Sequence, residues 1–261
     1  MNLFDWIIKL IGEYWELFLN GTKNTLIMSL TGTVIGFLIG LLIAIVRTIP
    51  TKKNTNGVLK ALLGAVNFVL NAYIEIIRGT PMMVQALIIH YSMFVPMGIS
   101  RIGDGILSAI IIISFNTGAY MAEIVRGGII SIDKGQFEGA HAIGMNHVQT
   151  MYHVILPQVI KNIMPSIGNE FVVNIKDSSV LNIIAITELM FVAKQAGGTY
   201  AKPVPAYIIC AIIYFVLTFT VTRILRLCEK KLAGSDSYTI CGSQSDPDAE
   251  IHVKKEEKVF R

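Results

Sequence analysis

Charged residues are scarce in this chain, and their scarcity excludes an ordinary soluble domain. Asp, Glu, Lys and Arg supply 15% of the 261 residues, whereas soluble domains carry about 25%. Four stretches contain none of these residues: Asn24–Val46, Thr80–Ser100, Gly105–Ala122 and Pro203–Thr222. A membrane-spanning helix needs about 20 predominantly apolar residues, so each stretch is long enough to span. The composition predicts an all-α, polytopic membrane protein.

Cysteine is rare, and the signatures of metal and nucleotide sites are lacking. Only three cysteines are present: Cys210, Cys228 and Cys241. They have no metal-like spacing and are too few for a disulfide framework. Three histidines of one polar stretch, His141, His147 and His153, lie six residues apart. Two ligands on one helix face need a spacing of four, so we expect no metal site. No glycine-rich loop precedes Lys-Ser or Lys-Thr, so we expect no nucleotide or other cofactor on this chain.

The first 20 residues lack the marks of a secretory signal peptide. Acidic residues occur where a basic leader would stand, and no small-residue cleavage site follows. Apolar residues recur there at helical spacing: Leu3, Ile7, Leu10, Ile11, Tyr14 and Phe18. This periodicity predicts an amphipathic helix over residues 1–20 that lies in the membrane interface. A transmembrane domain over residues 21–232 then follows.

The basic residues that are present indicate the orientation of the chain. They are concentrated in residues 47–60, in residues 126–161 and from residue 223 onward, whereas residues 98–104 hold only Arg101 beside Asp104. Positively charged short loops mark the cytoplasmic side of a membrane protein. The pattern therefore predicts an extracytoplasmic N-terminus and a cytoplasmic C-terminus.

Termini on opposite sides require an odd number of spans, and the four charge-free stretches leave one missing. The apolar stretch Ile160–Met190, which Glu170, Lys176 and Asp177 interrupt, supplies it as a span broken at these residues. Near the cytoplasmic end of the third span, Glu123 and Arg126 stand at i, i+3 spacing, which favours an ion pair. The five predicted spans cover about 24–47, 61–98, 103–126, 158–190 and 203–226. Residues 233–261 are rich in Ser, Asp, Glu and Lys and predict a disordered cytoplasmic tail.

A polar stretch interrupts the apolar pattern in the predicted cytoplasmic loop over residues 131–157. Ile132–Ile143 predicts a short helix, and Gly144 has the position and type of a helix stop. Asn146 can cap a second short helix through its side chain, and Pro157 suits the first turn of the next helix. The stretch predicts a helix–turn–helix elbow on the membrane face. On these local features alone, an ordinary well-formed loop is an equal alternative.

The elbow residues resemble a known family. Glu138-Gly139-Ala140, three residues, Gly144, nine residues and Val154-Ile155-Leu156-Pro157 are similar to the Glu-Ala-Ala loop of bacterial ABC-importer permeases. Gly139 replaces an alanine and Val154 an isoleucine of that pattern. The segments YIEIIRGTPMMVQ (73–85), AYMAEIVRGGIISI (119–132) and NIKDSSVL (174–181) resemble the subgroup that imports polar amino acids. The resemblance covers roughly residues 15–230.

The resemblance implies a coupling role for the elbow and a set of partners. Glu138, Gly139, Ala140 and Gly144, with Pro157 closing the motif, would couple the permease to a separate cytoplasmic ATPase dimer that holds Mg-ATP. A second permease copy or a paralogue would line the same path across the lipid bilayer. An extracytoplasmic binding protein would deliver a polar amino acid, and no nucleic-acid partner is expected. The protein would be a multi-pass component of the bacterial cytoplasmic membrane, and it would not itself be an enzyme.

Polar residues inside the predicted spans are candidates for substrate contact, because such residues are costly and usually functional. An amino acid needs an acceptor for its ammonium group and donors for its carboxylate. Asp177 and Glu75 could accept, and Ser178 could donate. Asn116 and Tyr120, one turn apart on the third span, are further candidates for the path. They could equally form hydrogen bonds with a neighbouring helix.

The charged candidates also have structural interpretations. Lys176 and Asp177 could neutralise each other or pair with residues of a neighbouring subunit. Glu75 stands at i, i+3 from Arg78, so a local ion pair explains it equally well.

Two other classes of function were weighed against the importer. A stand-alone secondary transporter is usually built from internal repeats, and none is evident here. An intramembrane enzyme needs paired acids, a metal cluster or a nucleophile beside a base. The acids within the predicted spans are scattered and mostly stand beside bases, which disfavours this class.

Overall fold

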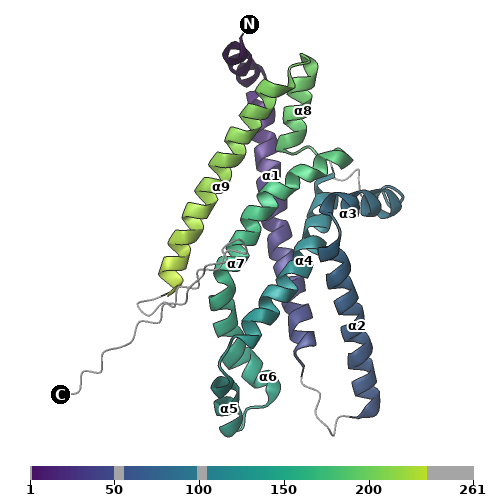
Figure 1. Cartoon of the computed structure of the whole chain (residues 1–261), viewed down its shortest axis with the longest axis vertical. Helices are drawn as coiled ribbons and strands as arrows, with labels where there is room; N and C mark the ends of the chain where they lie inside the picture. The colour runs from purple at the N-terminus through teal and green to yellow at the C-terminus, as the bar shows by residue number, and fades with distance from the viewer. Residues whose placement is uncertain (1, 50–55, 99–104, 234–261) are drawn as a thin grey trace, which may run out of the picture.

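The computed structural model describes residues 2–49, 56–98 and 105–233, and in these ranges every long element is a helix (Figure 1). The elements are α1 Leu3–Arg47, α2 Gly57–Gly79, α3 Met82–Ile89, the π-helix η1 His90–Phe94, α4 Ile106–Ile130, α5 Lys134–Ala142, α6 His147–Thr150, the π-helix η3 Met151–Ile155, α7 Leu156–Asp177, the 3₁₀ helix η4 Ser178–Ile184, α8 Leu189–Thr199 and α9 Pro203–Ala233. The predicted disordered tail lies outside the described residues, apart from Ala233 at the end of α9.

Among the described residues, four helices are long and apolar enough to cross a membrane, namely α1, α2, α4 and α9. A fifth crossing is possible as a broken pair, because His147–Ile184 and Leu189–Thr199 meet the same test together across a bend of 52°. The prediction of an all-helical polytopic fold is confirmed, and five spans is the upper count that the structure allows. The sides on which the termini lie stay a prediction.

Helix α1 differs from its prediction, because residues 1–20 do not form a separate interfacial helix. Leu3–Arg47 is one uninterrupted helix, about 68 Å long at about 1.5 Å per residue. The apolar face of its first turns packs within the protein, where Leu10 and Phe18 join a buried cluster with Leu189 and Ala206 of α8 and α9. Of the six residues that helical periodicity predicted for this face, Ile7, Leu10, Tyr14 and Phe18 pack in this cluster, whereas Leu3 and Ile11 are exposed.

The centre of the bundle is the contact between α1 and α4, and it depends on glycine. Gly32, Gly36 and Gly40 recur every fourth residue and turn one face of α1 toward α4. A Cβ added at Gly36 would lie 2.6 Å from the Thr117 Cβ, and one added at Gly40 would lie 2.7 Å from the Ala122 backbone nitrogen. The two backbones approach closely only because these side chains are missing, as is common between membrane helices.

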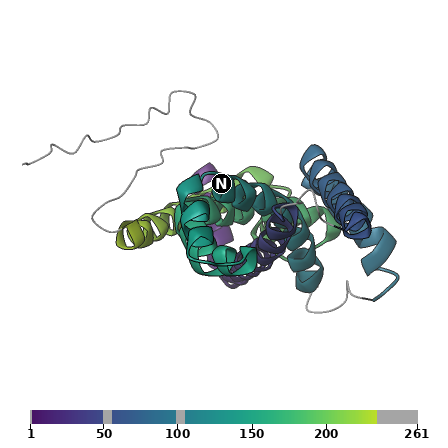
Figure 2. The same ribbon diagram turned by 90° about the horizontal axis from the view of Figure 1, so that it is seen from below.

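The predicted second span, 61–98, is divided in the structure. Helix α2 ends at Gly79, Thr80 is extended (φ −124°, ψ 145°), and Pro81 precedes α3. Proline has no N–H and pushes the residue before it out of the helical region, so one straight helix cannot form. The span is α2, whereas Met82–Phe94 is a shorter apolar helix that turns away from it (Figure 1). Seen along the bundle, α2 and α3 stand to one side (Figure 2).

The break in the fourth span lies later than predicted. Lys176 and Asp177 end α7 without interrupting the chain of helical turns, which tightens to 3₁₀ geometry from Ser178 to Ile184. The chain leaves the helix at Ala185, which has a left-handed φ of 58°, and α8 then begins after Glu188. Position 185 uses a conformation that is uncommon for a residue with a Cβ.

Candidate coupling elbow and membrane path

The elbow forms as predicted, through local capping at both sides of its turn. Gly144 has φ +84° and donates its N–H to the carbonyl of His141 at 3.0 Å, while the N–H of Met145 reaches the carbonyl of Ala140 at 3.0 Å. This pair of bonds is the Schellman motif that ends a helix with glycine. Asn146 then forms a reciprocal capping box with Gln149 at the start of α6. The helix stop and the cap are both confirmed.

Pro157 lies in the first turn of α7, as predicted, although that helix does not start afresh there. Helix α6 passes into α7 through the π-helical turn Met151–Ile155. Proline lacks an N–H and its ring crowds the carbonyl four residues earlier. The wider π turn, in which the Leu156 N–H reaches the carbonyl of Met151, directly precedes it. The second arm of the elbow is therefore continuous with α7.

The motif residues do not share one face of the elbow. Glu138, Gly139 and Gly144 are exposed, and a Cβ added at either glycine would meet nothing within 4 Å. Ala140 is only 5% exposed, so it packs against the protein's own chain and cannot offer its side chain to a partner. Of these two adjacent small residues, only Gly139 is exposed to another surface.

Sequence reasoning missed the apolar tip of the elbow. Ile143 and Val148, which lie before and after the turn at Gly144, are 75% and 74% exposed, and Tyr152 of η3 is 70% exposed. Figure 1 places α5 and α6 at the end of the molecule opposite the N-terminus. Three large exposed apolar side chains around a polar turn are typical of a protein contact. Single apolar residues between polar ones form no helical periodicity in a loop of this length, so the sequence did not predict these exposed apolar side chains.

The base of the elbow is packed into the bundle. A buried cluster joins α1, α4, the elbow and α7: Ala44, Val125, Ile129, Ile132, Met151, Ile155, Val159 and Ile163. Protein interiors are close-packed and deform little. The base of the elbow and three long helices therefore form one packed unit.

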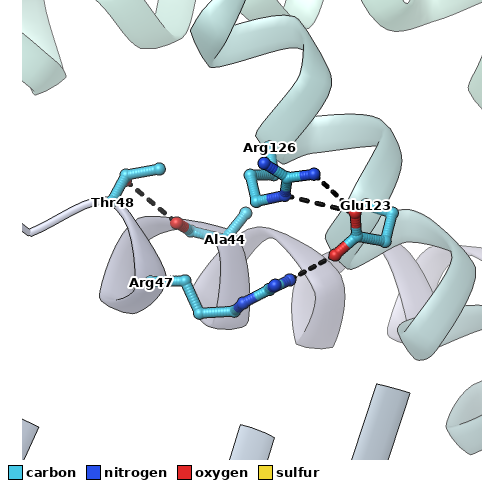
Figure 3. A network of polar contacts seen from close by, with 5 residues as sticks. All are labelled: Ala44, Arg47, Thr48, Glu123 and Arg126. Carbon is cyan, nitrogen blue, oxygen red and sulfur yellow. Dashed lines mark hydrogen bonds and ion pairs between the residues drawn. The ribbon is translucent and has the colours of Figure 1, made fainter. Parts of the chain in front are cut away.

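Beside this cluster, a charged network ties α1 to α4 (Figure 3). Glu123 accepts from Arg126 at 2.8 Å through one oxygen, and its other oxygen pairs with Arg47 of α1. The predicted Glu123–Arg126 pair is confirmed, and Arg47, 76 residues away in sequence, is its unpredicted third member. Thr48 closes the end of α1 by donating to the carbonyl of Ala44 at 2.9 Å.

Asp177 and Ser178, two of the substrate candidates, lie in different environments. Asp177 is exposed at the end of α7, and no ion pair within 4 Å joins it to Lys176 among the described residues. Ser178 is fully buried and donates to the carbonyl of Ile175 at 2.9 Å. Asp177 therefore stays accessible to a solute, whereas the hydroxyl of Ser178 is engaged by its own helix.

The other three candidates lie around α2 and α4. Glu75 is exposed on α2, and no ion pair with Arg78 forms within the described residues, because the Arg78 guanidinium lies 5.5 Å from the centre of the Tyr120 ring. Asn116 is buried and donates to Gln85 at 3.0 Å. Of the two interpretations of Asn116, the hydrogen bond to a neighbouring helix is the one observed.

A buried polar network at the centre of the bundle was not predicted. Asn174 of α7 donates to the hydroxyls of Thr33 at 2.8 Å and Thr117 at 2.9 Å, and its carbonyl accepts from Ser29 at 3.0 Å. The network joins α1, α4 and α7 where they cross. Asn174 lies three residues before Asp177, one of the predicted substrate candidates. The two differ in that the Asn174 side chain is buried, which the sequence does not reveal.

Glu188 was also missed, and it secures the break between η4 and α8. Its carboxylate is completely buried and accepts from the backbone N–H groups of Met190 at 2.8 Å and Phe191 at 2.6 Å and from the Tyr214 hydroxyl at 2.8 Å. A carboxylate at a helix N-terminus is favoured by the helix dipole. The signal was present in the sequence, because Thr-Glu before an apolar run is typical of a helix start.

Comparisons with known proteins agree with this arrangement. Residues 36–234 match the family described as "Binding-protein-dependent transport system inner membrane component". The glutamine transport system permease protein GlnP of Escherichia coli (strain K12) is 32% identical over 229 residues, which cover 88% of this chain and 98% of the relative. The L-cystine transport system permease protein TcyB of Bacillus subtilis (strain 168) is 31% identical over 221 residues, or 84% of this chain and 88% of the relative.

Solved structures show the same fold. An amino acid ABC transporter crystallised with histidines has a TM-score of 0.70 at 35% identity, covering 85% of this chain and 96% of that one. The MetNI methionine ABC transporter in an inward-facing conformation shares the fold at a TM-score of 0.62 and 19% identity, over 82% of this chain and 96% of that one. The chain belongs to the binding-protein-dependent inner membrane transport components, the permease subunits of ABC importers.

Proposed function

We propose that this permease subunit carries a polar amino acid across the cytoplasmic membrane and that its elbow couples transport to a separate ATPase. The observation that supports the proposal most directly is the elbow itself: its tip is apolar and exposed, while its base is packed into α1, α4 and α7. Such a lever can transmit the closure of a partner to the membrane helices, because packed elements move as units.

The proposed function requires several partner proteins. The sequence has no nucleotide-binding loop, so a cytoplasmic ATPase dimer supplies the energy. An extracytoplasmic binding protein delivers the solute, as the family description implies. A second permease copy or a paralogue completes the path. The relatives GlnP and TcyB are named for glutamine and L-cystine, which supports a polar amino acid as the solute.

The orientation is part of the proposal. The elbow must face the cytoplasm, where the ATPase is, and the basic residues on either side of it support this. The opposite end of the bundle, with the N-terminus and α8 (Figure 1), then faces the binding protein. Asp177, exposed where α7 ends, is the accessible acidic candidate for the ammonium group of the solute.

Replacing Gly144 with valine tests the coupling role. Gly144 has φ +84°, a left-handed conformation that costs a residue with a Cβ about 1–2 kcal/mol, so the turn should distort. We expect normal membrane insertion and ATP hydrolysis that no longer drives uptake. Gly12→Val is the matched control, because Gly12 lies in α1 with nothing within 4 Å of an added Cβ. Full uptake by Gly144→Val would refute the coupling role.

Co-purification separates the importer from a stand-alone secondary transporter. The importer requires an ATPase chain to accompany the tagged permease and requires ATP for uptake into proteoliposomes. Uptake by the purified chain alone, driven only by an ion gradient, would instead establish the secondary transporter.

A further inference from the structure

A groove between α7 and α9 combines three positive charges with aromatic rings. Its volume is about 280 Å³, which is close to the lower end of small-molecule pockets at about 300 Å³. The residues that line it are Val172, Lys176, Phe215, Thr218, Phe219, Thr222, Arg223 and Arg226. None of them is acidic, so the groove is a positively charged cleft with apolar walls.

The antiparallel course of the two helices directs the basic side chains toward each other. Helix α7 runs away from the elbow and α9 runs back toward that end of the molecule (Figure 1). Side chains lean toward the N-terminus of their own helix. Lys176 therefore leans toward the elbow end and Arg223 leans away from it, with its guanidinium 4.9 Å from the centre of the Phe219 ring. The two like charges converge on one groove.

Among the described residues, no ion pair within 4 Å involves these three cations. Within the described residues, the ion pairs are Lys9–Glu13 and the two that Glu123 makes, so none involves Lys176, Arg223 or Arg226. Asp177 follows Lys176 in the sequence but does not line the groove. Like charges that line one groove repel one another, and an anionic ligand would relieve this repulsion.

We propose that the groove binds the headgroup of an acidic phospholipid. Position favours a lipid, because Arg223 lies 20 residues after the start of α9, or about 30 Å along the helix, which is one hydrocarbon thickness. Arg223 and Arg226 thus reach the headgroup level when α9 spans the bilayer. Basic pockets between membrane helices are known to recognise acidic headgroups.

The apolar wall of the groove continues onto the surface and suits an acyl chain. Phe215 and Phe219 stack at 5.9 Å and are both exposed, and Ile212 and Val216 extend the exposed apolar surface along α9. A lipid can therefore place its phosphate among the cations and its chain along α9. A free anion would gain only the first of these contacts. The site goes beyond the proposed transport role and does not depend on the identity of the solute.

Lipid retention in nanodiscs tests the proposal. The full-length protein is placed in nanodiscs of equal phosphatidylglycerol and phosphatidylcholine, and native mass spectrometry measures which lipid stays bound. We expect wild type to retain phosphatidylglycerol preferentially. Lys176→Gln should reduce that preference about fivefold, which is the equivalent of about 1 kcal/mol per basic residue. Arg223→Gln/Arg226→Gln should reduce it on the order of 25-fold.

Two further variants distinguish a site from general attraction of charge. Lys60→Gln/Lys161→Gln removes two exposed cations outside the groove and should leave the preference unchanged. Val172→Trp fills the groove without altering charge and should abolish retention. The proposal is overturned if wild type shows no preference or if the control pair matches the arginine pair. It is also overturned if excess L-glutamine displaces the lipid, because the groove would then belong to the transport path. Both leaflets of the disc contain both lipids, so the outcome does not depend on orientation or transport.

Discussion

Replacing Gly40 with alanine should force α1 and α4 apart, because no room exists between them for one methyl group. The added Cβ would lie 2.7 Å from both the carbonyl carbon of Met121 and the backbone nitrogen of Ala122. Backbone atoms cannot rotate away as the end of a side chain can. The contact must therefore be relieved by moving one helix relative to the other.

The magnitude follows from a comparison with a matched glycine on the same helix. An extra methyl group in a well-packed interior costs about 1–3 kcal/mol, whereas alanine gains up to about 1 kcal/mol over glycine in any helix. Gly12 has nothing within 4 Å of an added Cβ, so Gly12→Ala retains only the gain. The helix preference of alanine over glycine is the same in both variants, so it cancels when their stabilities are compared. Their difference, about 1–3 kcal/mol, is the steric term alone.

Thermal unfolding of the purified protein in one detergent measures this difference. A change of 1 kcal/mol moves the melting temperature of a chain of this size by about 2–4 °C. Gly40→Ala should therefore melt about 2–12 °C below Gly12→Ala. Equal melting temperatures would show that α1 and α4 do not approach at these glycines, and the central contact of the fold would be wrong.

Two further predictions concern the polar contacts between helices. Asn174→Leu removes both hydrogen bonds that Asn174 donates in the central network, each worth about 0.6–1.7 kcal/mol in a membrane protein. The control is Asn162→Leu, at an exposed asparagine of the same helix. The Asn174 variant should melt clearly below this control, and equal melting temperatures would contradict the role of the network. For the pair that links α1 to α4, a double-mutant cycle of Glu123→Gln and Arg47→Gln should give a coupling energy of at least about 0.5 kcal/mol, and strictly additive effects would show that the pair is unimportant.

The elbow shows how far local sequence reasoning reaches. Gly144 and Asn146 act through bonds to residues within five positions of themselves, so their roles could be predicted without knowledge of the fold. The same reasoning placed Pro157 in the first turn of a helix, although it missed the π turn beside it. The burial of Ala140 was not predicted, because burial depends on tertiary contacts that no local pattern describes.

Hydropathy and charge alone determined that the chain is an all-helical membrane protein, and the elbow motif alone indicated its family. The tertiary structure decided which faces of the helices meet. Gly36 against Thr117, Asn174 between Thr33 and Thr117, and Arg47 against Glu123 are all pairings of distant segments. In a membrane, lipid-facing and helix-facing residues are equally apolar. Within the charge-free stretches, periodicity therefore cannot reveal the buried face, and only the packed helices show it.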